Sequence, residues 1–224
     1  MSEVVVWSWS LDDRRLQADG AEAVLSKTEW ARARRFVDAR HRQRFVASRI
    51  GLRGILGAHT GHEPSPLAFA ENEFGKPHLV GFPSLNFSLS HSDDQAVLAI
   101  REGAAIGIDI ERVRALEHDE IAARYFCASE AAWIDARPSE EERRTAFFQT
   151  WTLKEAVVKA LGMGMSMPLS EFEVSAGDTP PRLVVPAPGA SLDWQLRLLT
   201  APTGYLCALA APGASEVVVT QRTY

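Results

Sequence analysis

Residues 105–111 read Ala-Ile-Gly-Ile-Asp-Ile-Glu, near the middle of the 224-residue chain. Their alternation predicts a β-strand, because successive side chains of a strand point to opposite faces of the sheet. The three isoleucines face one way, and Asp109 and Glu111 face the other. The strand therefore buries one face and holds two carboxylates on the opposite one.

Asp109 and Glu111 stand at i and i+2, within reach of a single cation, and carboxylate oxygens are ligands that Mg²⁺ accepts. The alternative is a strand edge whose acids simply face solvent. A metal site at this strand needs a third ligand. Glu155 is the best candidate in the sequence.

Glu155 belongs to a helix predicted over residues 145–161, which is apolar around most of its circumference and stops at Gly162. Glu155, Thr152 and Lys159 form one polar stripe along it. The alternative is an exposed i, i+4 pair of Glu155 with Lys159. Because the apolar neighbours leave little surface for solvent, we expect the stripe to face an interior cleft.

Two segments before this strand carry groups that suit a phosphate. Residues 86–94 are predicted to form a polar turn whose Ser90, His91 and backbone amides can bind an oxyanion. A turn with a purely structural histidine is the alternative. Lys76 follows Gly75 in a turn that we expect to be rigid and exposed. There Lys76 can add a phosphate contact. The alternative is that, like most exposed lysines, it has no specific role.

A third basic feature is the segment 27–53, where nine Lys or Arg stand against two acids, a net charge of +7. Such a patch attracts phosphates, nucleic acid or acidic proteins, although a solvated helix face is the common explanation of a charge run. Nucleic acid is disfavoured, because the whole chain carries −5 and has no RNA- or DNA-binding pattern.

The remaining patterns indicate an α+β fold. Length permits one large domain or two halves, and we place a boundary at the turn 102–103, giving residues 1–103 and 104–224. Each half contains a Leu-Gly pair at a predicted helix end, followed by Pro-Leu and a Phe, which is a faint internal echo. The predicted strands are 3–11, 96–101, 105–111, 172–174, 183–185, 194–199 and 205–210. One helix is predicted to start at Ser26, which with Glu29 resembles a capping box, and to carry Phe36 on its apolar face. The other predicted helices are 38–56, which ends at Gly57, 129–136 and 145–161.

Composition indicates an ordinary globular protein, with 46% hydrophobic and 24% charged residues. The N-terminus lacks the features of a signal peptide, and no apolar stretch approaches the length of a membrane span. We therefore expect a cytoplasmic protein without a membrane partner. The two cysteines, Cys127 and Cys207, form neither a disulfide framework nor a metal-binding pattern.

Four motifs stand in chain order: Gly75-Lys76-Pro77, Phe87-Ser88-Leu89-Ser90-His91-Ser92, Gly107-Ile108-Asp109-Ile110-Glu111 and the helical segment from Trp151 to Gly162. Together they resemble those of the Sfp-type 4′-phosphopantetheinyl transferases, in the branch with Trp and Lys-Glu-Ala in the long helix. The resemblance implies two similar α+β halves about a pseudo-twofold axis, with coenzyme A and Mg²⁺ in the cleft between them.

The same resemblance assigns the candidate site. It implies that Asp109, Glu111 and Glu155 ligate Mg²⁺. It places Lys76, Ser90, His91 and Lys159 on the phosphates of coenzyme A. The basic segment supplies the partner of the 3′-phosphate, for which Arg44 is the first choice and Arg53 or Arg40 are alternatives.

The implied reaction joins the phosphopantetheine group to a serine of an apo acyl or peptidyl carrier protein and releases 3′,5′-ADP. Lys159 and His91 meet the charge that develops on the phosphate oxygens. Glu155, or Glu111 through a water, is the base for the serine proton, and the two remain open. We expect a monomer. The alternatives are a non-catalytic module that binds coenzyme A or the carrier, and a Mg²⁺-dependent pyrophosphate hydrolase.

Three residues or segments depart from the pattern of that family. Ile110 offers no ligand between the two acids, so a water is expected in that place. The helix ends Gly-Met-Gly, where many relatives have a lysine after the first glycine. Asp93 and Asp94 add negative charge beside the expected phosphates, and we expect both to point outward.

Overall fold

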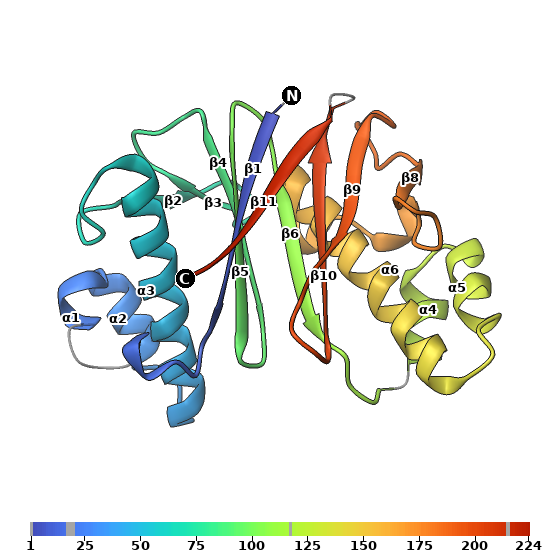
Figure 1. The fold of residues 1–224 in the computed structure, drawn as a ribbon, viewed down its shortest axis with the longest axis horizontal. Helices are drawn as coiled ribbons and strands as arrows, with labels where there is room; N and C mark the ends of the chain where they lie inside the picture. The colour runs from blue at the N-terminus through green and yellow to red at the C-terminus, as the bar shows by residue number, and fades with distance from the viewer. Residues whose placement is uncertain (1, 17–20, 117, 214–215) are drawn as a thin grey trace.

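The computed structural model describes residues 2–16, 21–116, 118–213 and 216–224 and has a mixed α+β architecture, with helices at both ends and sheets between them (Figure 1). The helices are α1 (Ala21–Val24), α2 (Lys27–Ala33), α3 (Ala39–Thr60), α4 (His118–Tyr125), α5 (Ala128–Asp135) and α6 (Glu140–Leu161). The strands are β1 (Ser2–Ser10), β2 (Phe69–Glu71), β3 (Pro77–Leu79), β4 (Leu85–Ser92), β5 (Gln95–Glu102), β6 (Gly107–Arg112), β7 (Glu173–Ser175), β8 (Arg182–Val185), β9 (Trp194–Leu199), β10 (Tyr205–Pro212) and β11 (Val217–Thr223).

Two principal sheets meet in the middle of the molecule. The first has the strand order β11-β1-β5-β4, with β11 parallel to β1 and the other neighbours antiparallel. The second is antiparallel, in the order β6-β10-β9. The edge strand β4 packs beside the edge strand β6, without sharing a backbone ladder with it (Figure 1). The seam between β4 and β6 therefore joins the two halves.

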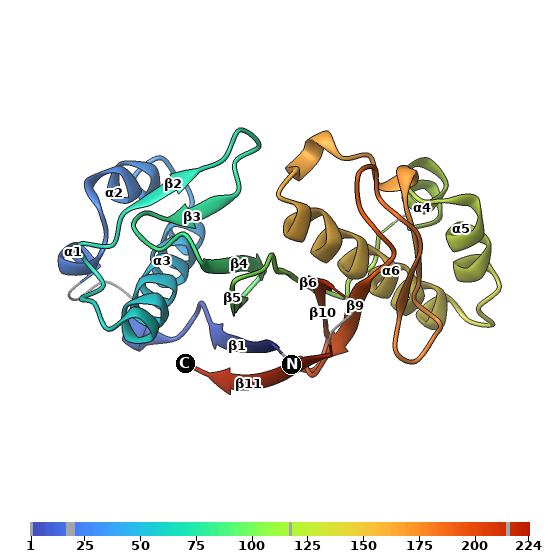
Figure 2. The ribbon, with the colours of Figure 1, turned by 90° about the horizontal axis from the view of Figure 1, so that it is seen from above.

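The two halves share a plan, which confirms the expected α+β fold of two similar halves. Each contains a helix of 22 residues, α3 in one and α6 in the other. Each helix ends at a glycine with the same left-handed backbone, φ 72° and ψ 23°, at Gly61 and Gly162. Each is followed by a two-stranded sheet, β2-β3 or β7-β8. Figure 2 shows β2 and β3 from above, beside α2 and α3.

The division at residues 103 and 104 remains a prediction, since the last strand crosses it. β11 follows the second half in sequence but pairs with β1 in the first sheet, with Val4 opposite Val219. This strand was not expected from the sequence, because Val217 is its only fully buried side chain and the others are half-buried or exposed. The C-terminal segment thus completes the N-terminal sheet.

Helix α3 extends further than predicted, and the predicted end at Gly57 is wrong. Asp38 caps its N-terminus by accepting a hydrogen bond from the backbone N–H of His41. Gly57 lies inside the helix, and a Cβ there would stand 2.7 Å from the carbonyl oxygen of His62. The glycine therefore permits a close chain approach, and the helix ends four residues later at Gly61.

The starts of two other helices follow their caps. Ser26 and Glu29 form the predicted capping box of α2, although that helix ends at Ala33 and does not include Phe36. Helix α6 begins at Glu140, five residues before its predicted start, because Ser139 forms a capping box with Glu142. Helix α4 had no counterpart in the sequence prediction.

The buried face of β6 explains why α6 and the sheets hold together. Ile106, Ile108 and Ile110 are at most 1% exposed and pack among the valines of the first sheet. Gly107 faces α6, where a Cβ would stand 1.9 Å from the carbonyl oxygen of Ala156. Within the described residues no helix is long and apolar enough to cross a membrane.

Candidate active site

The predicted carboxylates converge on the inner face of β6 and α6. Asp109 is 3% exposed, and its Oδ1 accepts hydrogen bonds from Ser90 Oγ at 2.7 Å and from Lys159 Nζ at 2.5 Å. Its second oxygen, Oδ2, is buried and accepts no hydrogen bond in the part of the chain that the structure describes. A buried carboxylate oxygen without a donor is an open position for a cation.

The electrostatics show that the three acids share one environment. Burial raises the pKa of Glu111, and the negative charge of Asp109 adds to the increase, while a hydrogen bond from Ser92 opposes it. Burial also raises the pKa of Glu155, reinforced by Asp109 and Glu111 and opposed by Lys159. The cluster therefore has more negative charge than its single ammonium neutralises.

The donor set fits Mg²⁺, which takes carboxylate oxygens and completes its shell with phosphate oxygens and water. Among the described residues, no three His, Cys, Asp or Glu side chains are grouped so that they could hold a metal ion together. Instead, the ammonium of Lys159 lies on Asp109. Burial raises the pKa of both Glu111 and Glu155, the charge of Asp109 adds to each increase, and Asp109 Oδ2 is open, so the residue types suit a divalent cation.

The segment 86–94 is a strand and not the predicted polar turn; only Asp93 and Asp94 turn. Its serines alternate along β4 and reach across the seam to β6. Ser88 Oγ accepts from the backbone N–H of Ile108 at 3.2 Å, and Ser92 Oγ donates to Glu111 Oε2 at 2.7 Å. Side-chain bonds therefore replace a backbone ladder between the two halves.

Ser90 and His91 consequently point to different places, because neighbours on a strand face opposite ways. Ser90 lies in the acid cluster, where its Oγ also accepts from Lys159 Nζ at 2.8 Å. His91 lines an adjoining pocket. Although its ring is exposed, partial desolvation and the Lys159 ammonium lower its pKa.

That pocket, of about 950 Å³, lies where α2, α3, β4 and the end of β6 meet. We call it the basic pocket. Apart from Asp93, its charged or titratable lining is basic: Arg32, His41, Arg44, Arg49, His91, Arg112 and Arg114. A pocket of this charge beside a carboxylate cluster suits a ligand with several phosphates.

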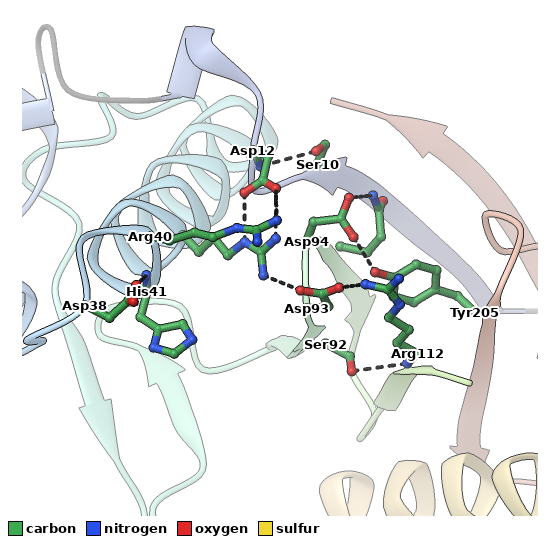
Figure 3. A network of polar contacts seen from close by, with 12 residues as sticks. Ser10, Asp12, Asp38, Arg40, His41, Ser92, Asp93, Asp94, Arg112 and Tyr205 are labelled. Carbon is green, nitrogen blue, oxygen red and sulfur yellow. Dashed lines mark hydrogen bonds and ion pairs between the residues drawn. The ribbon is translucent and has the colours of Figure 1, made fainter. Parts of the chain in front are cut away.

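Arg44, the first choice for the 3′-phosphate, does line the basic pocket. Asp12 accepts two hydrogen bonds from it, each 2.8 Å long, and Asp93 also contacts it. Arg40 joins the same network through Asp12 at 3.1 Å (Figure 3). The guanidiniums of Arg44 and Arg40 lower the pKa of Asp12 to about 2, so this carboxylate is ionised at neutral pH.

Arg53 is not positioned as the alternative assignment requires. It is 2% exposed, and its guanidinium bonds to Glu29 and to the backbone carbonyls of Pro64, Ser65 and Leu67. It lies on the buried face of α3, so its donors stabilise a loop. Arg53 therefore has a structural role, and its side chain has no open surface that a phosphate could contact.

Lys76 is not exposed as predicted. Its ammonium donates to the carbonyl oxygens of Ile106 and Ala160, at 3.2 and 3.1 Å, and burial lowers its pKa to about 8. Asn72 beside it donates to the carbonyl oxygen of Gly162 at 2.9 Å. This turn therefore binds the end of α6, and a phosphate contact by Lys76 stays a prediction.

The polar stripe on α6 is shorter than predicted. Thr152 is fully buried, and its hydroxyl bonds back to the carbonyl oxygen of Phe148 at 2.8 Å, so it is not part of the site. The sequence prediction did not single out five further basic residues of the pocket: Arg32, His41, Arg49, Arg112 and Arg114. The net charge of the basic segment included Arg32 and Arg49, whereas Arg112 and Arg114 lie outside that segment.

Comparison with known proteins agrees with this geometry. Residues 105–210 match the family described as the 4′-phosphopantetheinyl transferase superfamily, and residues 8–103 match 4′-phosphopantetheinyl transferase, N-terminal. The 4′-phosphopantetheinyl transferase HetI of a Nostoc species is 36% identical over 215 residues, which is 94% of this chain and 88% of that protein. A 4′-phosphopantetheinyl transferase of Bacillus subtilis is 31% identical over 169 residues, 74% of each chain. The transferase Sfp of Bacillus subtilis strain 168 is 29% identical over 165 residues, 72% of each.

The chain belongs to the 4′-phosphopantetheinyl transferase superfamily, whose members transfer phosphopantetheine from coenzyme A to carrier proteins. It is thus a transferase that uses coenzyme A as substrate and an apo carrier protein as acceptor. The branch with Trp and Lys-Glu-Ala stays a prediction.

Proposed function

We propose that this chain transfers phosphopantetheine to a serine of an apo acyl or peptidyl carrier protein in a Mg²⁺-dependent reaction, with Asp109, Glu111 and Glu155 as the residues that hold the metal. The observation that supports this proposal is the buried, undonated Oδ2 of Asp109 within a cluster of acids. When bound, Mg²⁺ would supply positive charge for the pyrophosphate oxygens.

The basic pocket would take the 3′-phosphate end of coenzyme A. Arg44 reaches it with a guanidinium that Asp12 already orients. Arg32 forms no ion pair within the described ranges and lies against the ring of Phe45, so its charge is available to a ligand. His91, on the same wall, would contact the phosphates nearer to the acids.

Lys159 would hold the pyrophosphate through its ammonium, which already reaches both Ser90 and Asp109. As the bridging oxygen leaves with 3′,5′-ADP, positive groups nearby stabilise the charge that it acquires. Lys159 would act from the acid cluster and His91 from the basic pocket, and the charge of Lys159 is near enough to act on His91. The enzyme itself supplies no nucleophile, since the carrier's serine hydroxyl attacks the phosphorus.

Glu155 is the better candidate for the base that accepts the serine proton. Glu111 already accepts a hydrogen bond from the hydroxyl of Ser92. Glu155 accepts no hydrogen bond from the described residues. Burial raises the pKa of Glu155, which makes it a stronger proton acceptor than an exposed carboxylate. A monomer acting in the cytoplasm, without nucleic acid or membrane, completes the proposal.

The test is to incubate the protein with coenzyme A, Mg²⁺ and apo carrier proteins of several types, and to measure the carriers by intact mass. A phosphopantetheine increment that disappears with EDTA supports the proposal, and no increment on any carrier overturns it. Parallel samples without carrier measure hydrolysis of coenzyme A. The module and hydrolase alternatives are not favoured, because the relatives are transferases.

A further inference from the structure

The turn between β4 and β5 contradicts its sequence prediction, since both of its acids point into the seam. Asp94 contacts the hydroxyl of Tyr205 on β10. Asp93 contacts Arg44 on α3 and Arg112 at the end of β6, which belong to different halves. Figure 3 shows Asp93 beside Arg112. Among the described residues Asp93 is also the one non-glycine residue with positive φ, at 49°. Two-residue hairpin turns require this backbone, and aspartate tolerates it.

Asp93 is an anion in a pocket otherwise built for anions. It lines the basic pocket together with Arg44 and Arg112. Its side chain is 25% exposed and therefore reaches the open space of the pocket as well as the two guanidiniums. In the absence of ligand, its carboxylate occupies donors that a phosphate would otherwise use.

We propose that Asp93 is an affinity-determining residue, an internal anion that competes with the 3′-phosphate of coenzyme A for Arg44 and Arg112. This inference rests on the proposed function, which places that phosphate in the basic pocket. Removing the competing charge strengthens the binding of every ligand with a 3′-phosphate, substrate and product alike. Asp93 thereby keeps 3′,5′-ADP from binding so tightly that its release is slow.

A purely structural role does not explain the contact, because Arg44 is already oriented without it. Asp12 holds the Nε and Nη2 atoms of Arg44 with two bonds of 2.8 Å, which leaves Nη1 for Asp93. The side chain of Arg112 is 55% exposed, and its backbone N–H is separately bound by Ser92 Oγ at 3.1 Å. Neutralising Asp93 therefore frees donors without disordering Arg44.

The clean substitution is Asp93→Asn, since asparagine tolerates positive φ and keeps the size of the side chain. Asp94→Asn is the matched control, because it makes the same charge change one residue away. Asp94 lines a different pocket and not the basic one, and it acts on Arg44 only through space. Asp93→Gly is a second variant that also accepts this backbone, should the asparagine variant fold poorly.

Calorimetric titration of each protein with coenzyme A, 3′,5′-ADP and dephospho-coenzyme A tests the inference. We expect Asp93→Asn to bind coenzyme A and 3′,5′-ADP about ten-fold more tightly, equivalent to ~1.4 kcal/mol. Binding of dephospho-coenzyme A, which lacks the 3′-phosphate, should change less than about two-fold. Asp94→Asn should tighten coenzyme A by less than about three-fold.

Unchanged or weaker binding of coenzyme A by both Asp93 variants, with native circular dichroism, overturns the inference. Equal tightening by Asp93→Asn and Asp94→Asn also overturns it, because net charge alone then explains the effect. Arg32→Ala separates this result from the proposed function. If Arg32→Ala does not weaken coenzyme A binding, the pocket assignment is wrong. If Arg32→Ala weakens coenzyme A binding but Asp93→Asn does not tighten it, only the inference about Asp93 fails.

Discussion

The buried ion pair between Lys154 and Glu130 offers the sharpest test of how the fold holds the site. Lys154 is fully buried and Glu130 is 4% exposed. The ammonium lies 2.6 and 2.7 Å from the two carboxylate oxygens and 2.6 Å from the carbonyl oxygen of Phe172. The backbone N–H groups of Cys127 and Val174 donate to the same carboxylate. This pair therefore joins α6, α5 and β7.

Replacing one partner, in Lys154→Met or Glu130→Gln, leaves the other group buried without its counter-charge. Breaking a buried pair in this way costs about 3–5 kcal/mol. With a urea m-value of about 2–3 kcal/mol/M, a loss of about 4 kcal/mol lowers the unfolding midpoint by about 1.3–2 M. Because Lys154 precedes Glu155 on α6, activity should fall together with stability.

Urea unfolding followed by circular dichroism measures the two single variants and the double variant Lys154→Met/Glu130→Gln. The double variant should recover part of the loss, since it leaves no unpaired buried charge. A loss below about 1 kcal/mol in both single variants would refute the reasoning, because such a value is typical of exposed pairs.

Three further predictions follow from individual contacts. Ser92→Ala removes the hydroxyl that orients Glu111, so the Mg²⁺ concentration needed for half-maximal rate should rise a few-fold, while Ser92→Thr restores it; an unchanged Mg²⁺ titration would contradict this. Gly107→Ala places a Cβ 1.9 Å from the carbonyl oxygen of Ala156, so thermal melts should show a loss of about 3 kcal/mol or more, and a native melting temperature would disprove the close packing. Burial lowers the pKa of Lys76 to about 8 from 10.5, so the unfolded chain binds more protons than the folded one between pH 8 and 10.5, and stability gains with rising pH in that window. Lys76→Met should lack this gain in urea unfolding across the same pH range, and identical pH slopes would count against it.

The parts that the sequence predicted are those set by local periodicity and caps. The alternation at residues 105–111 predicted a strand with two acids on one face, and the structure has β6 at Gly107–Arg112. The capping box of Ser26 with Glu29 likewise identified the start of α2. Each of these two signals comes from residues that lie close together along the chain.

The errors came from contacts between segments distant in sequence. The serines of β4 suggested a turn because polar residues usually mark one, but they are polar here since they bind β6 across the seam. Asp93 was expected to face solvent because its partners, Arg44 and Arg112, are 49 and 19 residues away. Neither relation leaves a local pattern in one sequence.

The candidate site shows the same division. Spacing and family motifs predicted the four residues Asp109, Glu111, Glu155 and Lys159. In the structure Lys159 forms an ion pair with Asp109, and the charges of these two residues act on Glu111 and Glu155. The choice among the arginines could not be made that way. Arg44 and Arg53 are both basic residues on α3, and only packing shows that one reaches the pocket whereas the other supports a loop.

The most direct test of the account is the intact mass of an apo carrier protein after incubation with coenzyme A, Mg²⁺ and either wild-type enzyme or Asp109→Ala. We expect the wild type to add the phosphopantetheine group. Asp109→Ala should add none on the same time scale, with its circular dichroism unchanged. Near-native transfer by Asp109→Ala would contradict the assignment of this carboxylate cluster as the catalytic site.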